Sequence, residues 1–221
     1  MKARALVAEF IGTFALLFVV FLVVNNFDKN PVQLLAIALG VGLTIACFGT
    51  ALGPISGGHF NPCVTFGMMI AKKIDAATGI AYWVAQIVGG IAAVFTASFL
   101  LGPAGEAARA ATSVGRGPGI EITQAIVAEA IAAFFFLTVI FMTAVDKRAP
   151  AIGAWFLGLT LTIGILAIGP ISGGAINPAV GIALSVGSAK WNNALSWSIG
   201  PLLGAGIAAL LYTGLWSKEE A

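Results

Sequence analysis

Apolar residues in this chain form long, nearly unbroken runs instead of the alternating patterns of soluble helices and strands. A helix of roughly 20 apolar residues crosses the hydrocarbon core of a bilayer, and six runs reach that length: residues 5–25, 32–52, 79–101, 121–144, 151–169 and 193–216. Two further runs begin after Asn61 and Asn177 and end before Lys72 and Lys190. Each is only about 15 Å long as a helix. Neither spans a membrane alone, but the two placed end to end span it once.

Composition supports a membrane protein. The 221 residues are 59% hydrophobic and only 9% charged, which excludes an ordinary soluble domain with a solvated surface. We therefore expect an all-α, multi-pass protein of the cell membrane. If successive spans cross the membrane in opposite directions, the Lys and Arg residues divide into two groups. Seven lie on the side of the two chain ends (Lys2, Arg4, Lys72, Lys73, Lys147, Arg148, Lys218) and four lie on the other side (Lys29, Arg109, Arg116, Lys190). The positive-inside rule then predicts that both termini are cytoplasmic.

One twelve-residue block occurs twice. Gly53–Val64 reads GPISGGHFNPCV and Gly169–Val180 reads GPISGGAINPAV, with nine identical positions. Each half of the chain holds three spans and one short run, and because three is odd, the second half must enter the membrane from the opposite side. We predict a single channel domain over 1–221, built from inverted repeats at about 1–101 and 120–217 and joined by an external loop at 102–119.

The Asn-Pro pair in each block predicts a helix start. Asn caps a first turn with its side-chain oxygen, and Pro suits the first helical position. The Ser-Gly-Gly run before each pair does not continue a helix, and such backbone is tolerated at membrane depth only where it is buried in protein or lines a cavity. We expect a track of carbonyls from Gly57, Gly58, His59, Gly173, Gly174 and Ala175. The two positive helix ends meeting at the midplane would repel cations and let neutral molecules pass.

Two Asn-Pro boxes, the His-Phe-Asn-Pro loop, Glu9, Glu129 and the motif Tyr82-Trp83-x-Ala85-Gln86 resemble the aquaporin (major intrinsic protein) family over essentially the whole chain. The resemblance implies six transmembrane helices with two re-entrant half-helices, and a homotetramer with one pore per subunit. Water and small uncharged solutes would pass without a cofactor. It also implies that Glu9 and Glu129 brace the loops, with a proton relay as the alternative, and that the pore centre comprises Asn61, Pro62, Cys63, Asn177, Pro178 and Ala179.

The chain departs from the family at the narrow outer filter, which the resemblance places at Val41, Ile165, Gly174 and Val180. Val180 stands where the family typically carries arginine, Val41 where it often has an aromatic residue, and Ile165 where strict water channels have histidine. We therefore expect a wider, more apolar filter. Gly181–Ala183 also lacks the aspartate of the glycerol-channel branch. Candidate solutes are polyols such as glycerol, urea, ammonia and neutral metalloid hydroxides, including arsenite and methylated arsenicals.

Two residues near the first box have open roles. Cys63 replaces the usual alanine and is either a small packed residue or a reactive thiol that mercurials block. His59, the single histidine, either lines the pore and supports the loop or acts as a pH gate.

Other classes of protein have less support. An ion-coupled secondary transporter also uses inverted repeats and broken helices, but it normally needs charged coupling sites that the two blocks lack. A non-conducting junction protein is a third class. An enzyme, a metal site and a nucleic-acid partner are not expected, because one histidine and two cysteines form no catalytic or metal-binding motif. The expected partners are water, small neutral solutes and the lipid bilayer.

Overall fold

The computed structural model describes residues 3–149 and 152–217. Six helices in this part of the chain are long and apolar enough to cross a membrane, which confirms the predicted spans. They are α1 (Ala3–Asn26), α2 (Gln33–Ser56), α4 (Ala76–Leu100), α6 (Ile122–Ile140) with its π-helical extension η2 (Phe141–Val145), α7 (Trp155–Ser172), and α9 (Ala194–Leu211) with η3 (Tyr212–Trp216). Two short helices, α3 (Pro62–Ile70) and α8 (Pro178–Ser188), follow the Asn-Pro pairs as predicted.

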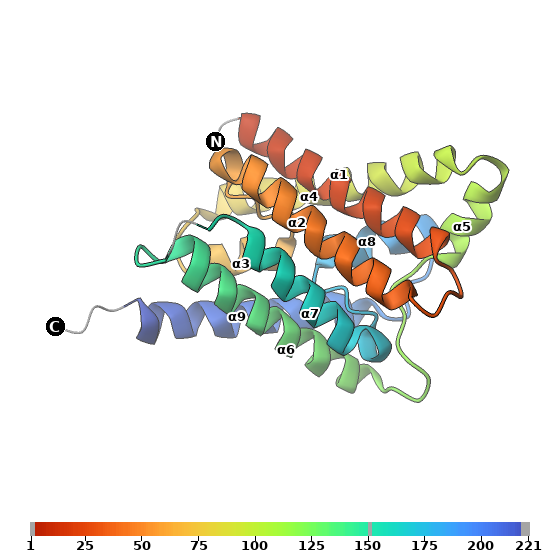
Figure 1. Cartoon of the computed structure of the whole chain (residues 1–221). Helices are drawn as coiled ribbons and strands as arrows, with labels where there is room; N and C mark the ends of the chain where they lie inside the picture. Colours follow the sequence, from red (N-terminus) through yellow and green to blue (C-terminus); the bar gives the residue numbers. More distant parts are fainter. Residues whose placement is uncertain (1–2, 150–151, 218–221) are drawn as a thin grey trace.

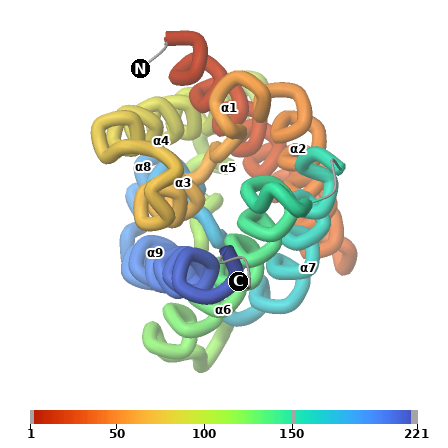
Figure 2. The backbone as a smooth tube through the Cα atoms, turned by 90° about the vertical axis from the view of Figure 1, so that its left-hand side faces the viewer, coloured from red at the N-terminus to blue at the C-terminus, as the bar shows by residue number. Residues whose placement is uncertain are grey.

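The spans and the two short helices together form a ring. Viewed along the bundle, α1, α2, α7 and α6 follow one another, and α3 and α8 lie between α4 and α9 (Figure 2). The α1–α4 and α6–α9 pairs are the most extensively packed, and α2 packs against α7 between the two halves. The start of α1 and the end of α9 lie at the same end of the bundle, and α5 lies at the other (Figure 1). Lys2 and Lys218, used in the charge comparison, lie outside the described residues.

The predicted ends of two spans were wrong. Helix α2 continues past residue 52 through Pro54 to Ser56, and α7 continues past 169 through Pro170 to Ser172. A proline near a helix end removes one intrahelical bond without stopping the helix, whereas a left-handed glycine does stop it. Gly57 (φ 92°) and Gly173 (φ 90°) are those glycines, and their N–H groups donate to the carbonyls of Gly53 and Gly169 at 2.8 and 3.0 Å.

The connection 102–119, expected as a loop, contains the 3₁₀ turn η1 (Gly102–Ala104) and helix α5 (Gly105–Ala111). The sequence of α5, GEAARAA, is rich in strong helix formers. A tertiary contact holds it in place: Arg109 Nη1 donates to the Gly187 carbonyl at 2.8 Å. This carbonyl is near the C-terminal end of α8, where a cation also complements the helix dipole.

Small residues allow α2 and α7 to cross closely. A Cβ atom on Gly42 would overlap the Gly158 carbonyl and the Thr162 hydroxyl, and a Cβ on Gly158 would overlap the Gly42 carbonyl. Close backbone approach of this kind is how helices associate in lipid, where hydrophobic burial provides little drive. The crossing places Val41 and Ile45 of α2 and Leu161 and Ile165 of α7 along one internal cavity.

Candidate pore

Each asparagine of the two Asn-Pro boxes caps its own half-helix. Asn61 is extended (φ −159°, ψ 120°) and its Oδ1 accepts from the Cys63 N–H at 2.9 Å. Asn177 has nearly the same geometry (φ −154°, ψ 109°) and accepts from the Ala179 N–H at 2.9 Å. The local chemistry of Asn followed by Pro therefore starts α3 and α8 as predicted.

The same asparagines also join the two halves of the chain. Asn61 Nδ2 donates to the Ile176 carbonyl at 2.9 Å, and Asn177 Nδ2 donates to the Phe60 carbonyl at 3.1 Å. The N-terminal ends of α3 and α8 therefore lie beside each other. An amide nitrogen carries two hydrogens, so each side chain retains one donor beyond these bonds.

Two buried carboxylates hold the loop backbone in this shape. Glu9 accepts from the N–H groups of His59 (3.0 Å) and Phe60 (2.7 Å), and Glu129 accepts from those of Ala175 (2.9 Å) and Ile176 (2.6 Å). The hydroxyls of Ser56 and Ser172 donate to the same carboxylates, and Gln86 Nε2 adds a further bond to Glu9.

Both loops contain a bulky residue in the left-handed region, Phe60 at φ 47° and Ile176 at φ 50°. Such a conformation costs about 1–3 kcal/mol and persists only where its surroundings fix it. Glu9 and Glu129 supply that constraint here by binding the N–H of each strained residue. The strained turn also aims the carbonyls of Phe60 and Ile176 at the opposite asparagine.

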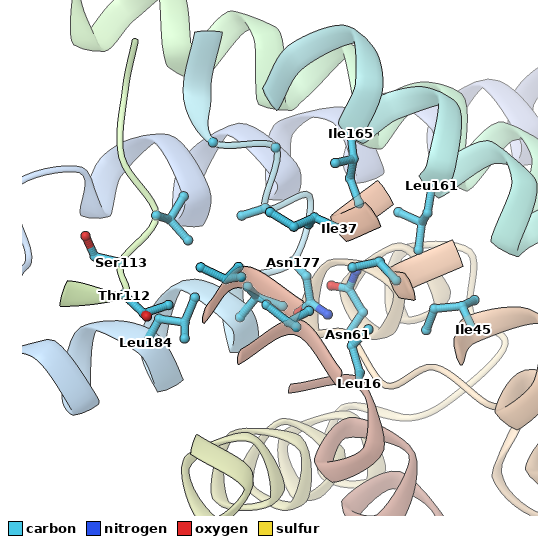
Figure 3. A pocket seen from close by; sticks show the side chains of 18 of the residues that line it. Leu16, Ile37, Ile45, Asn61, Thr112, Ser113, Leu161, Ile165, Asn177 and Leu184 are labelled. Carbon is cyan, nitrogen blue, oxygen red and sulfur yellow. The ribbon is translucent and has the colours of Figure 1, made fainter. Parts of the chain in front are cut away.

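A cavity of about 190 Å³, the outer cavity, extends from the segment after α5 past the two asparagines. Thr112 and Ser113 lie at one end, Ile45 at the other, and Asn61 and Asn177 side by side between them (Figure 3). A second cavity of about 240 Å³, the inner cavity, continues toward Lys73 near the other end of the bundle. Together the two cavities follow the bundle axis through the centre of the molecule.

The structure brings most of the predicted site residues to these cavities. The outer cavity is lined by both asparagines, by the four predicted filter positions and by the loop residues of the second half, namely Asn61, Asn177, Val41, Ile165, Gly174, Val180, Gly173 and Ala175. Gly57 and Gly58 line the inner cavity, and His59 lines both. Among the described residues that line the outer cavity there is no Lys, Arg, Asp or Glu.

Four residues assigned to the pore centre are packed inside the first turns of the half-helices. Pro62, Pro178 and Ala179 are buried there. Cys63 has no exposed surface, and its thiol donates to the Ile176 carbonyl at 3.3 Å. This position matches the packed interpretation of Cys63 better than the reactive one.

One wall of the outer cavity was missed by the sequence analysis. It is formed by Thr112, Ser113 and Val114, which follow α5. The Thr112 hydroxyl accepts from Asn25 Nδ2 at 3.0 Å, and further along the same segment the Gly117 N–H donates to the Ile171 carbonyl at 3.0 Å. Val114 packs so closely over Gly173 that a Cβ on that glycine would lie 2.7 Å from it. This segment lies outside the repeated halves, so internal similarity gave no sign of its position.

Comparisons with known proteins agree with the geometry. The family model described as "Major intrinsic protein" matches residues 1–212. The chain is 34% identical to "Aquaporin AqpM" of Methanothermobacter marburgensis, covering 96% of this chain and 97% of that protein. It is 33% identical to "Probable aquaporin TIP2-2" of Oryza sativa subsp. japonica, covering 95% and 86%.

Among solved structures, the fold is similar to that of the aquaglyceroporin from Plasmodium falciparum, with a TM-score of 0.82 and 24% identity over 96% of each chain. The chain therefore belongs to the major intrinsic protein family and has the aquaporin fold.

Proposed function

We propose that this chain forms a passive channel whose outer filter admits uncharged solutes larger than water. Membership of the aquaporin family supports a channel for water and small solutes. The observation that carries the finer proposal is the outer cavity itself, because Val41, Ile165, Gly174 and Val180 line one continuous space with the two asparagines. The filter has no arginine fork to narrow it or to bind water.

The outer cavity has walls of two kinds. Backbone at Gly173–Ala175 and the remaining amide hydrogens of Asn61 and Asn177 provide polar partners, while side chains such as Leu16 and Ile165 provide an apolar wall. A molecule with hydroxyl or amide groups on an apolar frame can contact both walls at once, whereas water gains little from the apolar one. Glycerol-like polyols and urea therefore suit this passage, and ammonia and neutral arsenic hydroxides are further candidates.

We assign the exclusion of cations to the centre of the channel, where the two half-helices meet. The N-terminal ends of α3 and α8 each carry roughly half a positive charge, and they adjoin at Asn61 and Asn177. In this proposal Glu9 and Glu129 brace the loops and hold these ends in register. The assembly is a homotetramer in the cell membrane with cytoplasmic termini, and each subunit has its own pore.

The test is stopped-flow permeability of the purified protein in liposomes to water, glycerol, urea and arsenite, comparing the wild type with Val180→Arg. The arginine should reduce glycerol and urea flux about tenfold more than water flux, which is the scale of steric discrimination in an apolar site. Val32→Arg, at an exposed position just before α2, is the matched control and should leave all four fluxes unchanged.

The other classes predict different results. Equal solute profiles for wild type and Val180→Arg would show that the filter assignment is wrong. Swelling no faster than that of empty liposomes would indicate a non-conducting protein. Accumulation driven by an imposed proton or sodium gradient would identify a secondary transporter.

A further inference from the structure

The outer and inner cavities are separate spaces that share three lining residues: Ile45, His59 and Phe136. The division between the cavities therefore falls at these three side chains. It does not fall at the outer filter, because all four filter positions line a single cavity together with Asn61 and Asn177. Figure 3 shows Ile45 beyond Asn61 as seen from Ser113, on the side that leads toward the inner cavity.

His59 is held rigidly at this division. Its backbone N–H donates to Glu9 at 3.0 Å, its Nδ1 lies 3.0 Å from Thr65 Oγ1, and its ring packs edge-on against Tyr82 with centroids 5.3 Å apart. His59 is 7% exposed. Swinging the imidazole aside would break its contacts with Thr65 and Tyr82 together, so the ring is a fixed wall.

Thr65 binds one nitrogen of the imidazole and leaves the other available. Gln86 Nε2 donates to Thr65 Oγ1 at 3.0 Å, and His59 Nδ1 lies 3.0 Å from the same oxygen. Among the described residues, His59 Nε2 makes no hydrogen bond. It is therefore the one polar side-chain group at the division, and it donates or accepts according to the tautomer of the ring.

Two large apolar side chains complete the division. Ile45 comes from α2 and Phe136 from α6, and they are 5% and 3% exposed. Ile45 lies one helical turn beyond Val41 on the same face of α2, about 6 Å further along the axis. The same wall of α2 therefore contributes to both the filter and the division, and Phe136 and His59 line the division beside it.

We propose that Ile45, His59 and Phe136 form an inner ring that sets the upper size of the transported solute, in place of the outer filter. The inference rests on the proposed function, because it names the residues that limit the same passage. A solute that enters the wide outer cavity binds at the asparagines and must then pass the ring with His59 Nε2 as its one polar side-chain contact. Short polyols and urea pass, and longer or branched solutes stop there.

The chain offers a matched pair of substitutions. Ile45→Ala removes the same atoms from the ring that Ile165→Ala removes from the outer filter, and both residues are buried. Permeability to erythritol relative to glycerol, measured in liposomes, should rise roughly tenfold for Ile45→Ala and stay at the wild-type value for Ile165→Ala. Ile45→Phe should lower even water flux, whereas Ile165→Phe should have less effect. If an alanine variant is not monodisperse, Ile45→Val and Ile165→Val give the same comparison with a smaller change.

The outcomes separate this inference from the proposed function. A rise for Ile165→Ala without a rise for Ile45→Ala, an equal rise for both, or no change for either overturns the inner ring while the wild type still conducts. A wild-type protein that conducts none of the solutes overturns the proposed function and the inner ring with it.

Discussion

Asn61 and Asn177 each donate a side-chain hydrogen bond to the carbonyl that precedes the other: Asn61 to Ile176 at 2.9 Å and Asn177 to Phe60 at 3.1 Å. Each asparagine thus caps its own half-helix and fixes the position of the opposite one. The N-terminal ends of α3 and α8 both carry partial positive charge and repel each other. The two hydrogen bonds hold them together against this repulsion. The ends of the two half-helices are therefore a cross-linked unit, and a substitution in one should also displace the other.

Asn177→Asp tests this cross-link. The aspartate oxygen still caps the Ala179 N–H, but the acid cannot donate to Phe60 and it presents a carboxylate to the passing solute. We expect neutral-solute flux to fall about tenfold or more and stability to fall by about 1–3 kcal/mol, the cost of an unsatisfied buried carbonyl. Liposome permeability and thermal unfolding in detergent measure the two effects.

Asn193→Asp is the matched control for a buried amide. Asn193 precedes α9 and donates Nδ2 to the Ser172 carbonyl at 3.2 Å, and it is 3% exposed. The control should lose stability and keep its permeability once reconstituted. If both variants lost flux equally, the Asn177 effect would reflect general damage and not the pore centre.

The crossing of α2 and α7 gives a second prediction. Gly42→Ala should destabilise the protein by about 1–3 kcal/mol, because the new methyl group overlaps Gly158 and Thr162. Gly53→Ala, on the same helix but with no atom within 4 Å of the added Cβ, should be neutral or stabilising by up to about 1 kcal/mol. Thermal unfolding of the two variants side by side decides the matter, and equal melting temperatures would refute the close crossing.

The sequence predicted those features whose causes are local. Asn followed by Pro starts a helix wherever it stands, and apolar length alone marks a span, so α3, α8 and the six spans were predictable. The end of α2 was not, because whether Pro54 or Gly57 stops the helix depends on backbone geometry that either residue permits.

Features set by tertiary packing could not be predicted from the residues of the sequence alone. Ile45 and Phe136 belong to different halves and meet only when α2 and α6 are assembled, and neither stands out among the many apolar residues of their helices. Thr112 lines the outer cavity, where its hydroxyl accepts a hydrogen bond from Asn25. The four predicted filter positions came only from the resemblance to a family, since spacing from the two boxes has no meaning without one.

Glu129 supplies a third prediction. Its carboxylate accepts from Ser172 and from the N–H groups of Ala175 and Ile176. In Glu129→Gln one acceptor oxygen becomes an NH₂ group that faces these donors. We expect a loss of about 1–3 kcal/mol for each donor left unsatisfied, together with reduced flux, because the loop of the second half would no longer be held in its left-handed turn.

The control for this prediction is Glu121→Gln. Glu121 is exposed at the start of α6, where it forms a capping box with Gln124, and glutamine can accept the same bond. Its melting temperature should stay near that of the wild type. Should Glu129→Gln be as stable and as conductive as Glu121→Gln, the bracing role of Glu129 would have to be abandoned.

The final prediction concerns pH and the ends of two helices. Asp146 follows η2, and Arg148 binds its carboxylate through Nε and Nη2 at 2.8 and 2.7 Å while also donating to the Trp216 carbonyl at the end of η3. Hydrogen bonds from Arg148 lower the pKa of Asp146 to about 2. The folded state thus favours the charged carboxylate more than the unfolded chain does, where the pKa is about 3.9.

A lowered pKa fixes the direction of the pH effect. The stabilisation from Asp146 is fully present above about pH 4 and is lost as the pH falls through about 2, where the carboxylate is protonated in both states. Asp146→Asn should therefore melt below the wild type by a constant interval from pH 8 to pH 5, and the two should converge toward pH 2. Asp28→Asn, in the exposed turn after α1, should change stability by less than about 0.5 kcal/mol at pH 7. An interval that stays constant down to pH 2, or that widens there, would mean that the Asp146–Arg148 pair does not tie these two helix ends together.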